Sequence, residues 1–213
     1  MGSGGIGGAG RGKAARAPHG APASNRSRTG RVTSRFLVLA AYTAAIFLTL
    51  PYGPRIGLGF LRTGIGSFAF GWGIIGAAIA GALALLALLR RRGAPAWAYA
   101  TLGLAAVGYL VAFAWLSAAR LERVHLPEYG VAAFLAWRCM EPLVPGLVPV
   151  YVAGAVLAAA IGGADELLQS IVPGRVCDWR DALANALAAV LGMLVVATLR
   201  ATRPLSDGPS SRR

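Results

Sequence analysis

Residues 65–89, IGSFAFGWGIIGAAIAGALALLALL, are the stretch that decides the fold class, because they contain no charged residue. A helix rises ~1.5 Å per residue, so about 20 apolar residues cross the ~30 Å hydrocarbon core of a bilayer. This stretch exceeds that length. It therefore predicts a transmembrane helix.

Further apolar stretches lie on both sides of this one, and the chain is 56% hydrophobic and only 14% charged. They cover residues 36–52, 96–119, 126–140, 143–163 and 182–199. The stretch 126–140 is only just long enough to span, and a re-entrant hairpin with the next stretch would lower the count. We predict an all-α fold, a polytopic transmembrane helical bundle of about six spans, with five as the alternative.

The two ends of the chain differ from the apolar middle. Residues 1–34 are rich in Gly, Ala, Ser and Arg and lack aliphatic periodicity, which predicts a disordered basic tail. A cleaved signal peptide is the alternative, but the first apolar stretch ends at Tyr52 without a small-residue cleavage site. Between the ends we expect three spans in residues 35–119 and three in residues 120–200, followed by a disordered tail in residues 201–213.

The net charge of +13 raises the question of nucleic-acid binding, but the basic residues flank apolar stretches and form no patch with aromatic residues. With both termini in the cytoplasm, fifteen of the 21 basic residues lie on the inner side and six in outer loops. An excess of Lys and Arg in cytoplasmic loops is typical of membrane proteins. The distribution predicts cytoplasmic termini, a lipid bilayer as the surroundings, and no nucleic-acid partner.

Acidic residues are few, and six of the eight fall at the outer surface in this topology. They are Glu122, Glu128, Asp165, Glu166, Asp178 and Asp181. Ionisable groups beside hydrocarbon cost several kcal/mol unless they are hydrated, paired or functional. Their concentration on one face therefore indicates a functional site there.

The first polar motif comes just before and within the fourth stretch. His125, Glu128 and Tyr129 stand at i, i+3 and i+4, so in a helix they line one stripe. A histidine and a carboxylate on one stripe are candidates for acid–base chemistry. A single histidine at a membrane interface is also common for purely structural reasons.

The second motif closes the fifth stretch. Asp165, Glu166 and Gln169 stand at i, i+1 and i+4, so in a helix Gln169 lies on the same face as the two carboxylates, and a Pro-Gly pair then predicts a turn before Arg175. Arg175 is a candidate ligand for a phosphate or carboxylate, and an anchor to lipid headgroups is its structural alternative. A single histidine among irregularly spaced carboxylates does not predict a zinc site, so the sequence assigns no metal ligands and no cofactor.

The third motif opens the last stretch. Asp178, Asp181 and Asn185 stand at i, i+3 and i+7, which places them on one helix face. Asp178 is a candidate N-cap and Asp181 a favourable charge in the first turn, so both have a structural explanation as well as a functional one. Asn185 lies deeper, where a hydrogen bond to a neighbouring helix is expected.

Taken in chain order, these motifs resemble those of the VanZ-like family of bacterial membrane proteins. The elements are Glu122-Arg123-Val124-His125, Glu128-Tyr129, Asp165-Glu166-Leu167-Leu168-Gln169, Pro173-Gly174-Arg175, and then Asp178, Asp181, Asn185 and Gly192. The chain departs at Ala188, where a glycine often follows the asparagine. The resemblance implies a protein of the bacterial plasma membrane, in a family named for an accessory protein of glycopeptide resistance associated with teicoplanin.

Two functional hypotheses follow. The first is a VanZ-like protein of the cell envelope, linked to teicoplanin-type resistance, in which the polar residues form a network that locks helices together. The second is a membrane-embedded enzyme acting at the outer leaflet on an envelope lipid or a lipid-linked cell-wall precursor. In that hypothesis Arg175 binds the substrate, and His125 with Glu128 or Asp165 acts as acid and base.

Overall fold

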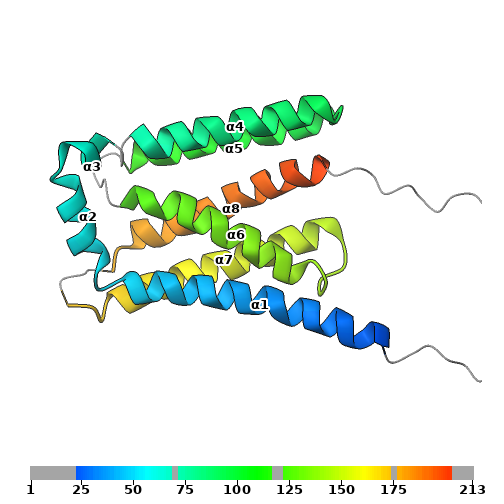
Figure 1. Ribbon diagram of the computed structural model, residues 1–213, viewed down its shortest axis with the longest axis horizontal. Coiled ribbons are helices and arrows are strands. Elements are labelled where there is room, and N and C mark those ends of the chain that lie inside the picture. Colours follow the sequence, from blue (N-terminus) through cyan, green and yellow to red (C-terminus); the bar gives the residue numbers. More distant parts are fainter. Residues whose placement is uncertain (1–22, 69–71, 117–121, 174–176, 203–213) are drawn as a thin grey trace, which may run out of the picture.

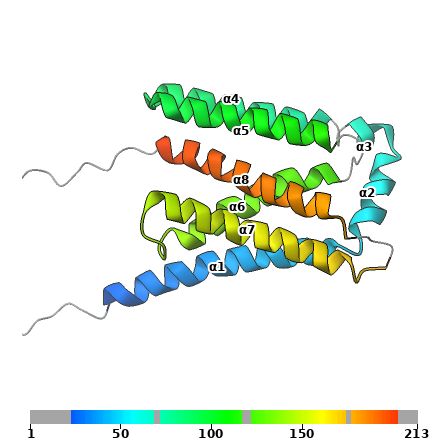
Figure 2. The same cartoon turned by 180° about the vertical axis from the view of Figure 1, so that it is seen from behind.

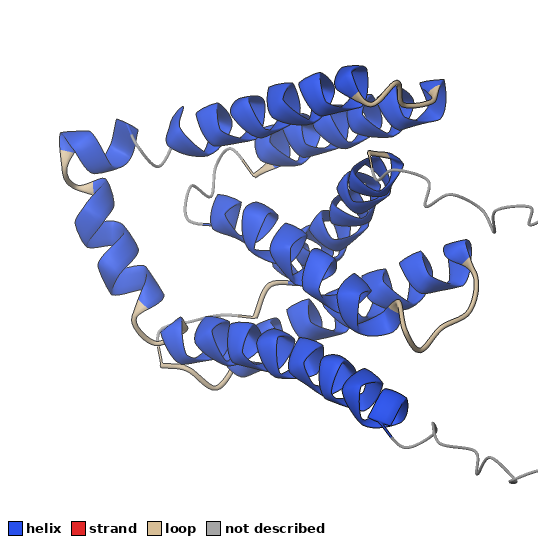
Figure 3. Ribbon diagram, turned by 45° about the vertical axis from the view of Figure 1, so that its right-hand side comes forward, coloured by secondary structure: helices blue, strands red, loops and turns tan. Residues whose placement is uncertain are grey.

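The computed structural model describes residues 23–68, 72–116, 122–173 and 177–202, and within these ranges all regular structure is helical (Figure 3). The helices are α1 (Ala23–Thr49), α2 (Gly53–Leu61), α3 (Gly64–Phe68), α4 (Ile74–Arg91), α5 (Ala96–Trp115), the 3-10 turn η2 (Glu122–Val124), α6 (His125–Met140), α7 (Leu147–Gln169) and α8 (Trp179–Ala201). The predicted all-α bundle is confirmed. Most of the two expected tails, residues 1–22 and 203–213, lies outside the described ranges.

The long helices run lengthwise between two ends of the bundle, whereas α2 and α3 lie across one end (Figure 1). Seen from in front and from behind, the start of α1 and the end of α8 both lie at the opposite end of the bundle (Figures 1 and 2). We call the end that carries α2 and α3 the closed end, and the other the terminal end. Both described chain ends therefore lie on the same side of the bundle.

Five helices are long and apolar enough to cross a membrane: α1 from Thr29, α4, α5, α7 and α8. The fourth apolar stretch, residues 126–140, was also expected to span. It forms α6, whose 16 residues reach only about 24 Å. It nevertheless runs in the same lengthwise direction as its neighbours (Figure 1). The structure thus contains five candidate spans together with a shorter helix alongside them.

The boundaries differ from the sequence predictions in two places. The stretch 65–89 is divided between α3, which ends at Phe68, and α4, which begins at Ile74, and residues 69–71 lie outside the described ranges. The candidate span therefore begins at Ile74, later than the sequence predicted. In addition, α1 begins at Ala23, inside the segment predicted as a tail.

The hairpin between α4 and α5 follows from local sequence. α4 ends with Arg90 and Arg91, whose charges suit a helix C-terminus. Gly93 adopts a left-handed φ of 59°, and its N–H donates to the carbonyl of Arg90 at 3.2 Å. Pro95 then precedes the first turn of α5, with φ fixed in the extended region. The two helices consequently return antiparallel to one another (Figure 1).

The centre of the bundle is α8, which packs against α5, α6 and α7. In the most apolar 18 residues of α8, half of the residues are buried inside the protein, whereas only 6% are buried in the most apolar 18 residues of α4. Outer helices expose large apolar side chains such as Leu37, Leu83, Leu110 and Val156. Because water does not solvate such a surface favourably, the exposed faces are those of a multi-pass membrane protein in lipid.

Small residues bring the three motif-bearing helices close together. A Cβ on Gly162 of α7 would lie 2.6 Å from Cβ of Asn185 in α8. A Cβ on Gly192 of α8 would lie 2.8 Å from Cβ of Ala133 in α6. Glycine at a contact allows two helices to approach closely, which is common inside membranes. This tight packing fixes the positions of the polar residues.

Candidate functional site

The polar residues meet because of helix direction. α6 begins, α7 ends and α8 begins at the closed end of the bundle (Figures 1 and 2). The first motif opens α6, the second closes α7 and the third opens α8. Antiparallel connections therefore bring the three motifs, which are far apart in the chain, to a single end of the molecule. We call this group of side chains the polar cluster.

α6 contributes His125, Glu128 and Tyr129. His125 is buried, and its Nδ1 lies 3.6 Å from Oε2 of Glu128. The ring of Tyr129 stacks on the imidazole with centroids 6.0 Å apart. The i, i+3, i+4 spacing thus places the three side chains on one stripe that faces the inside of the bundle.

α7 contributes two carboxylates and an amide. Asp165 and Glu166 are buried, with 0% and 2% of their surfaces exposed. Nε2 of Gln169 donates to Oδ2 of Asp165 at 3.3 Å and to Oε1 of Glu166 at 3.0 Å. This amide therefore holds the two carboxylates in a common orientation.

α8 contributes Asp178, Asp181 and Asn185. Asp178 caps the helix, because its Oδ1 accepts from the backbone N–H of Arg180 at 2.9 Å, as the sequence predicts. The backbone N–H of Asp178 in turn donates to Oε2 of Glu166 at 3.4 Å. Asp181 is buried, and Asn185 donates from Nδ2 to the carbonyl of Gly162 at 3.2 Å. These bonds tie α8 to the end of α7.

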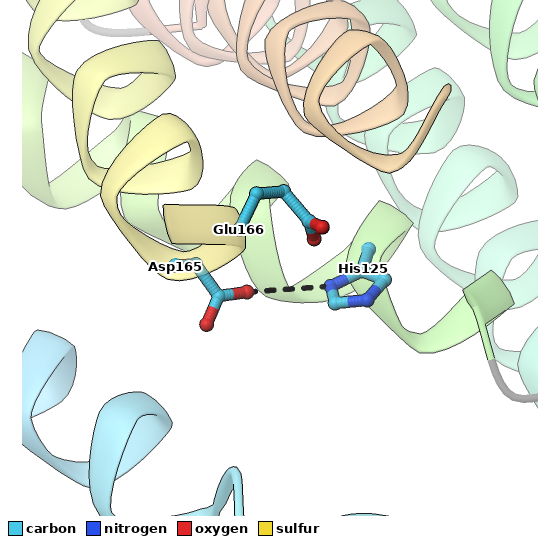
Figure 4. Close-up of side chains that lie close together, drawn as sticks. All are labelled: His125, Asp165 and Glu166. Carbon is cyan, nitrogen blue, oxygen red and sulfur yellow. Dashed lines mark ion pairs between the residues drawn. The ribbon is translucent and has the colours of Figure 1, made fainter. Parts of the chain in front are cut away.

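At the middle of the polar cluster, His125, Asp165 and Glu166 point toward one another (Figure 4). One nitrogen or oxygen atom from each lies within 4.8 Å of the others, and Nδ1 of His125 is 4.0 Å from Oδ2 of Asp165. All three are buried. The sequence placed these residues on one face of the membrane but could not place them in mutual contact.

Several buried polar atoms of the polar cluster complete no hydrogen bond with the described part of the chain. They are Nδ1 of His125, the hydroxyl of Tyr129, Oδ1 of Asp165 and Oδ1 of Asn185. A buried polar group without a partner costs roughly 1–3 kcal/mol, so such groups are uncommon in structural networks. The cluster therefore retains capacity to bind a ligand.

Two further residues, Arg175 and Tyr42, bear on how far the site extends beyond the polar cluster. Arg175 lies outside the described residues, so its predicted place beside the polar cluster stays a prediction. Tyr42 of α1 was not singled out from the sequence, yet its hydroxyl donates to the carbonyl of Glu128 at 3.0 Å. A phenol within an otherwise apolar span was the one available signal.

A second charged group lies at the terminal end, away from the polar cluster. Arg35 of α1 contacts Oε2 of Glu141 at 3.3 Å and the carbonyl of Arg138 at 2.7 Å. Arg200 of α8 lies 4.0 Å from Oε1 of Glu141. These half-exposed ion pairs join helix ends. A substitution of Glu141 therefore serves as a control for substitutions in the polar cluster.

The comparisons with known proteins agree with the motifs. The family model described as VanZ/LLP1 matches residues 81–200, a range that contains α6, α7 and all of α8 except its last residue, and hence every motif of the polar cluster. No curated protein and no solved structure matches the chain.

Proposed function

The chain belongs to the VanZ/LLP1 family, and from this premise we propose that it acts in the bacterial plasma membrane on the headgroup of an envelope lipid or a lipid-linked cell-wall precursor. The polar cluster is the site of this action. Its activity alters the envelope and thereby the susceptibility of the cell to teicoplanin-type glycopeptides.

The observation that carries the proposal is the set of buried polar atoms in the polar cluster that complete no hydrogen bond within the described residues. Asp165 and Glu166 lie in the last two turns of α7, within about 6 Å of its end at ~1.5 Å per residue. That depth corresponds to the level of lipid headgroups rather than the middle of the hydrocarbon. A polar headgroup entering from the bilayer can therefore reach the cluster while its acyl chains stay in lipid.

The distribution of basic residues supports a position of this site at the outer leaflet. The polar cluster lies at the closed end, opposite the start of α1 and the end of α8 (Figure 1). The excess of basic residues at the chain ends favours cytoplasmic termini. The closed end then faces the cell wall.

The proposed chemistry is proton transfer to or from the bound lipid headgroup. His125 accepts or donates a proton, and Glu128 at 3.6 Å and Asp165 at 4.0 Å stabilise the protonated imidazole. Arg175, which follows α7 in the chain, binds the phosphate of the headgroup. Exclusion of bulk water by the surrounding helices strengthens each of these interactions.

A second candidate function is a non-catalytic envelope factor whose polar residues lock three helices together. The bond from Asn185 of α8 to the carbonyl of Gly162 in α7 favours this alternative, as does the bridging amide of Gln169. In this case the same side chains stabilise the bundle, and its outer surface binds a partner.

The two functions are separated by substitutions in the native host. His125→Gln and Arg175→Ala remove proposed chemistry, while Glu141→Gln at the terminal end is the control. We expect normal membrane abundance of all three variants, with an altered envelope-lipid profile and altered teicoplanin susceptibility only for the first two. Loss of the His125 variant from the membrane would favour the structural alternative. Normal abundance with unchanged lipids and susceptibility would refute the proposed function.

A further inference from the structure

Three side chains in the polar cluster have the chemistry of a metal-ligand set. His125 offers an imidazole nitrogen, and Asp165 and Glu166 each offer a carboxylate oxygen, all within 4.8 Å of one another. We propose that these three residues bind one divalent cation of the Mn²⁺ or Zn²⁺ type. The role of the cation in catalysis rests on the proposed function, whereas cation binding is a property of the protein alone.

The donor types select the class of cation. Carboxylate oxygens suit hard cations such as Mn²⁺ and Mg²⁺, and imidazole suits Zn²⁺ and other first-row transition metals. A set of one imidazole and two carboxylates therefore fits Mn²⁺ or Zn²⁺ better than Ca²⁺, which prefers oxygen ligands throughout.

The charge at this position also favours a cation. Asp165 and Glu166 are almost completely buried, and within the described residues the ion pair of Asp165 is with His125 alone. Two carboxylates side by side in a low-dielectric site repel each other strongly unless positive charge lies between them. A divalent ion supplies two positive charges at the point where the three side chains converge (Figure 4).

An independent observation comes from Tyr129, which is not one of the three ligands. Its hydroxyl is completely buried and faces the carboxylate of Asp165, but no contact to a described residue has the geometry of a full hydrogen bond. Oδ1 of Asp165 is likewise without a partner there. A hydrated cation beside Asp165 would bring a water that accepts from or donates to this hydroxyl.

The surrounding hydrogen bonds resemble the supporting shell of a metal site. Gln169 donates to one oxygen of Asp165 and one of Glu166, which leaves Oδ1 of Asp165 available. The backbone N–H of Asp178 orients the remaining oxygen of Glu166 at 3.4 Å. Outer contacts of this kind fix the direction of ligand carboxylates and strengthen metal binding.

The geometry needs little adjustment to hold the ion. Ligand atoms at ~2.1 Å from a tetrahedral metal lie roughly 3.4 Å apart. Nδ1 of His125 lies 4.0 Å from Oδ2 of Asp165, the oxygen that accepts from Gln169, so a small side-chain rotation brings one oxygen of this carboxylate into coordination beside the imidazole. Three protein ligands leave at least one position for water or a substrate oxygen. With Nδ1 of His125 bound to the cation, this nitrogen no longer exchanges the proton, and Glu128, 3.6 Å from it, takes over that role in the proposed function.

The test measures binding to the purified full chain in lipid nanodiscs after removal of bound metal with a chelator. Mn²⁺ is titrated and the free ion is followed by electron paramagnetic resonance, and Zn²⁺ is titrated by calorimetry. We expect one equivalent per chain. Asp165→Asn and Glu166→Gln, which keep the side-chain shape, should each raise the dissociation constant by at least roughly tenfold. Glu141→Gln at the terminal end should bind as the wild type does.

Wild-type protein provides a readout that does not depend on the folding of any variant. Saturating Mn²⁺ or Zn²⁺ should raise its unfolding temperature, because a ligand of the native state stabilises that state. Absence of saturable binding by the wild type, or equal affinity in both carboxylate variants, would overturn the proposal. Cation binding in nanodiscs together with unchanged lipids in the His125→Gln strain would uphold the site and refute only the proposed function.

Discussion

The contact between α7 and α8 at Gly162 gives a stability prediction that tests the geometry of the polar cluster. In Gly162→Ala the new Cβ would lie 2.6 Å from Cβ of Asn185 and 3.2 Å from Cε1 of Tyr129. Ordinary contacts begin near 3.4 Å, so the helices must separate by about 0.8 Å. Because Cβ of Asn185 is attached directly to the backbone, a rotamer change cannot relieve the clash.

Gly163→Ala is the matched control, since a Cβ there meets no atom within 4 Å in the described structure. Both substitutions gain the same helix propensity, about 1 kcal/mol, so this gain cancels between them. Overpacking should cost Gly162→Ala about 1–3 kcal/mol. Stretching the hydrogen bond from Asn185 to the carbonyl of Gly162 should destabilise Gly162→Ala by about 1 kcal/mol more.

We therefore expect Gly162→Ala to be less stable than Gly163→Ala by about 2–4 kcal/mol. The assay is thermal and denaturant unfolding of both purified variants in the same detergent, followed by circular dichroism. Equal stability of the two variants would refute the close approach of α7 and α8. The position of Asn185 beside Tyr129 would then be wrong as well.

Two further substitutions test the helix cap and the contact from α1. Asp178→Ala removes the acceptor for the N–H of Arg180 and should destabilise the protein by about 1 kcal/mol in the same unfolding assay. Asp178→Asn should restore most of that stability, and a stable alanine variant would argue against the cap. Tyr42→Phe deletes the bond to the carbonyl of Glu128 and should cost about 0.5–1.5 kcal/mol. No loss in this variant would show that α1 does not bind α6 through the phenol.

The spans were predictable because a bilayer imposes a simple requirement on sequence. Apolar stretches of about 20 residues indicate spanning helices whatever their neighbours are. The stretch 65–89 was the exception, because the candidate span begins only at Ile74 and residues 64–68 belong to the separate helix α3. Hydropathy reports how apolar a stretch is, and it does not report the direction in which each helix runs.

The polar cluster was predictable only in part. The i, i+3, i+4 spacing of His125 and Tyr129 is local and requires nothing beyond helical geometry. The N-cap role of Asp178 is local in the same sense. The contact of Tyr42 with α6 depends on how α1 packs, and no spacing in the chain encodes it.

The sequence by itself determined a helical multi-pass membrane protein, its VanZ-like motifs and the helix faces on which its polar residues stand. Those properties follow from composition and from the 3.6-residue period of a helix. Only the tertiary structure decided that His125 of α6 meets Asp165 and Glu166 of α7. That meeting depends on antiparallel helix directions and on the close approach that Gly162 and Gly192 permit. Contacts between distant segments arise from packing, and packing is a property of all three helices together.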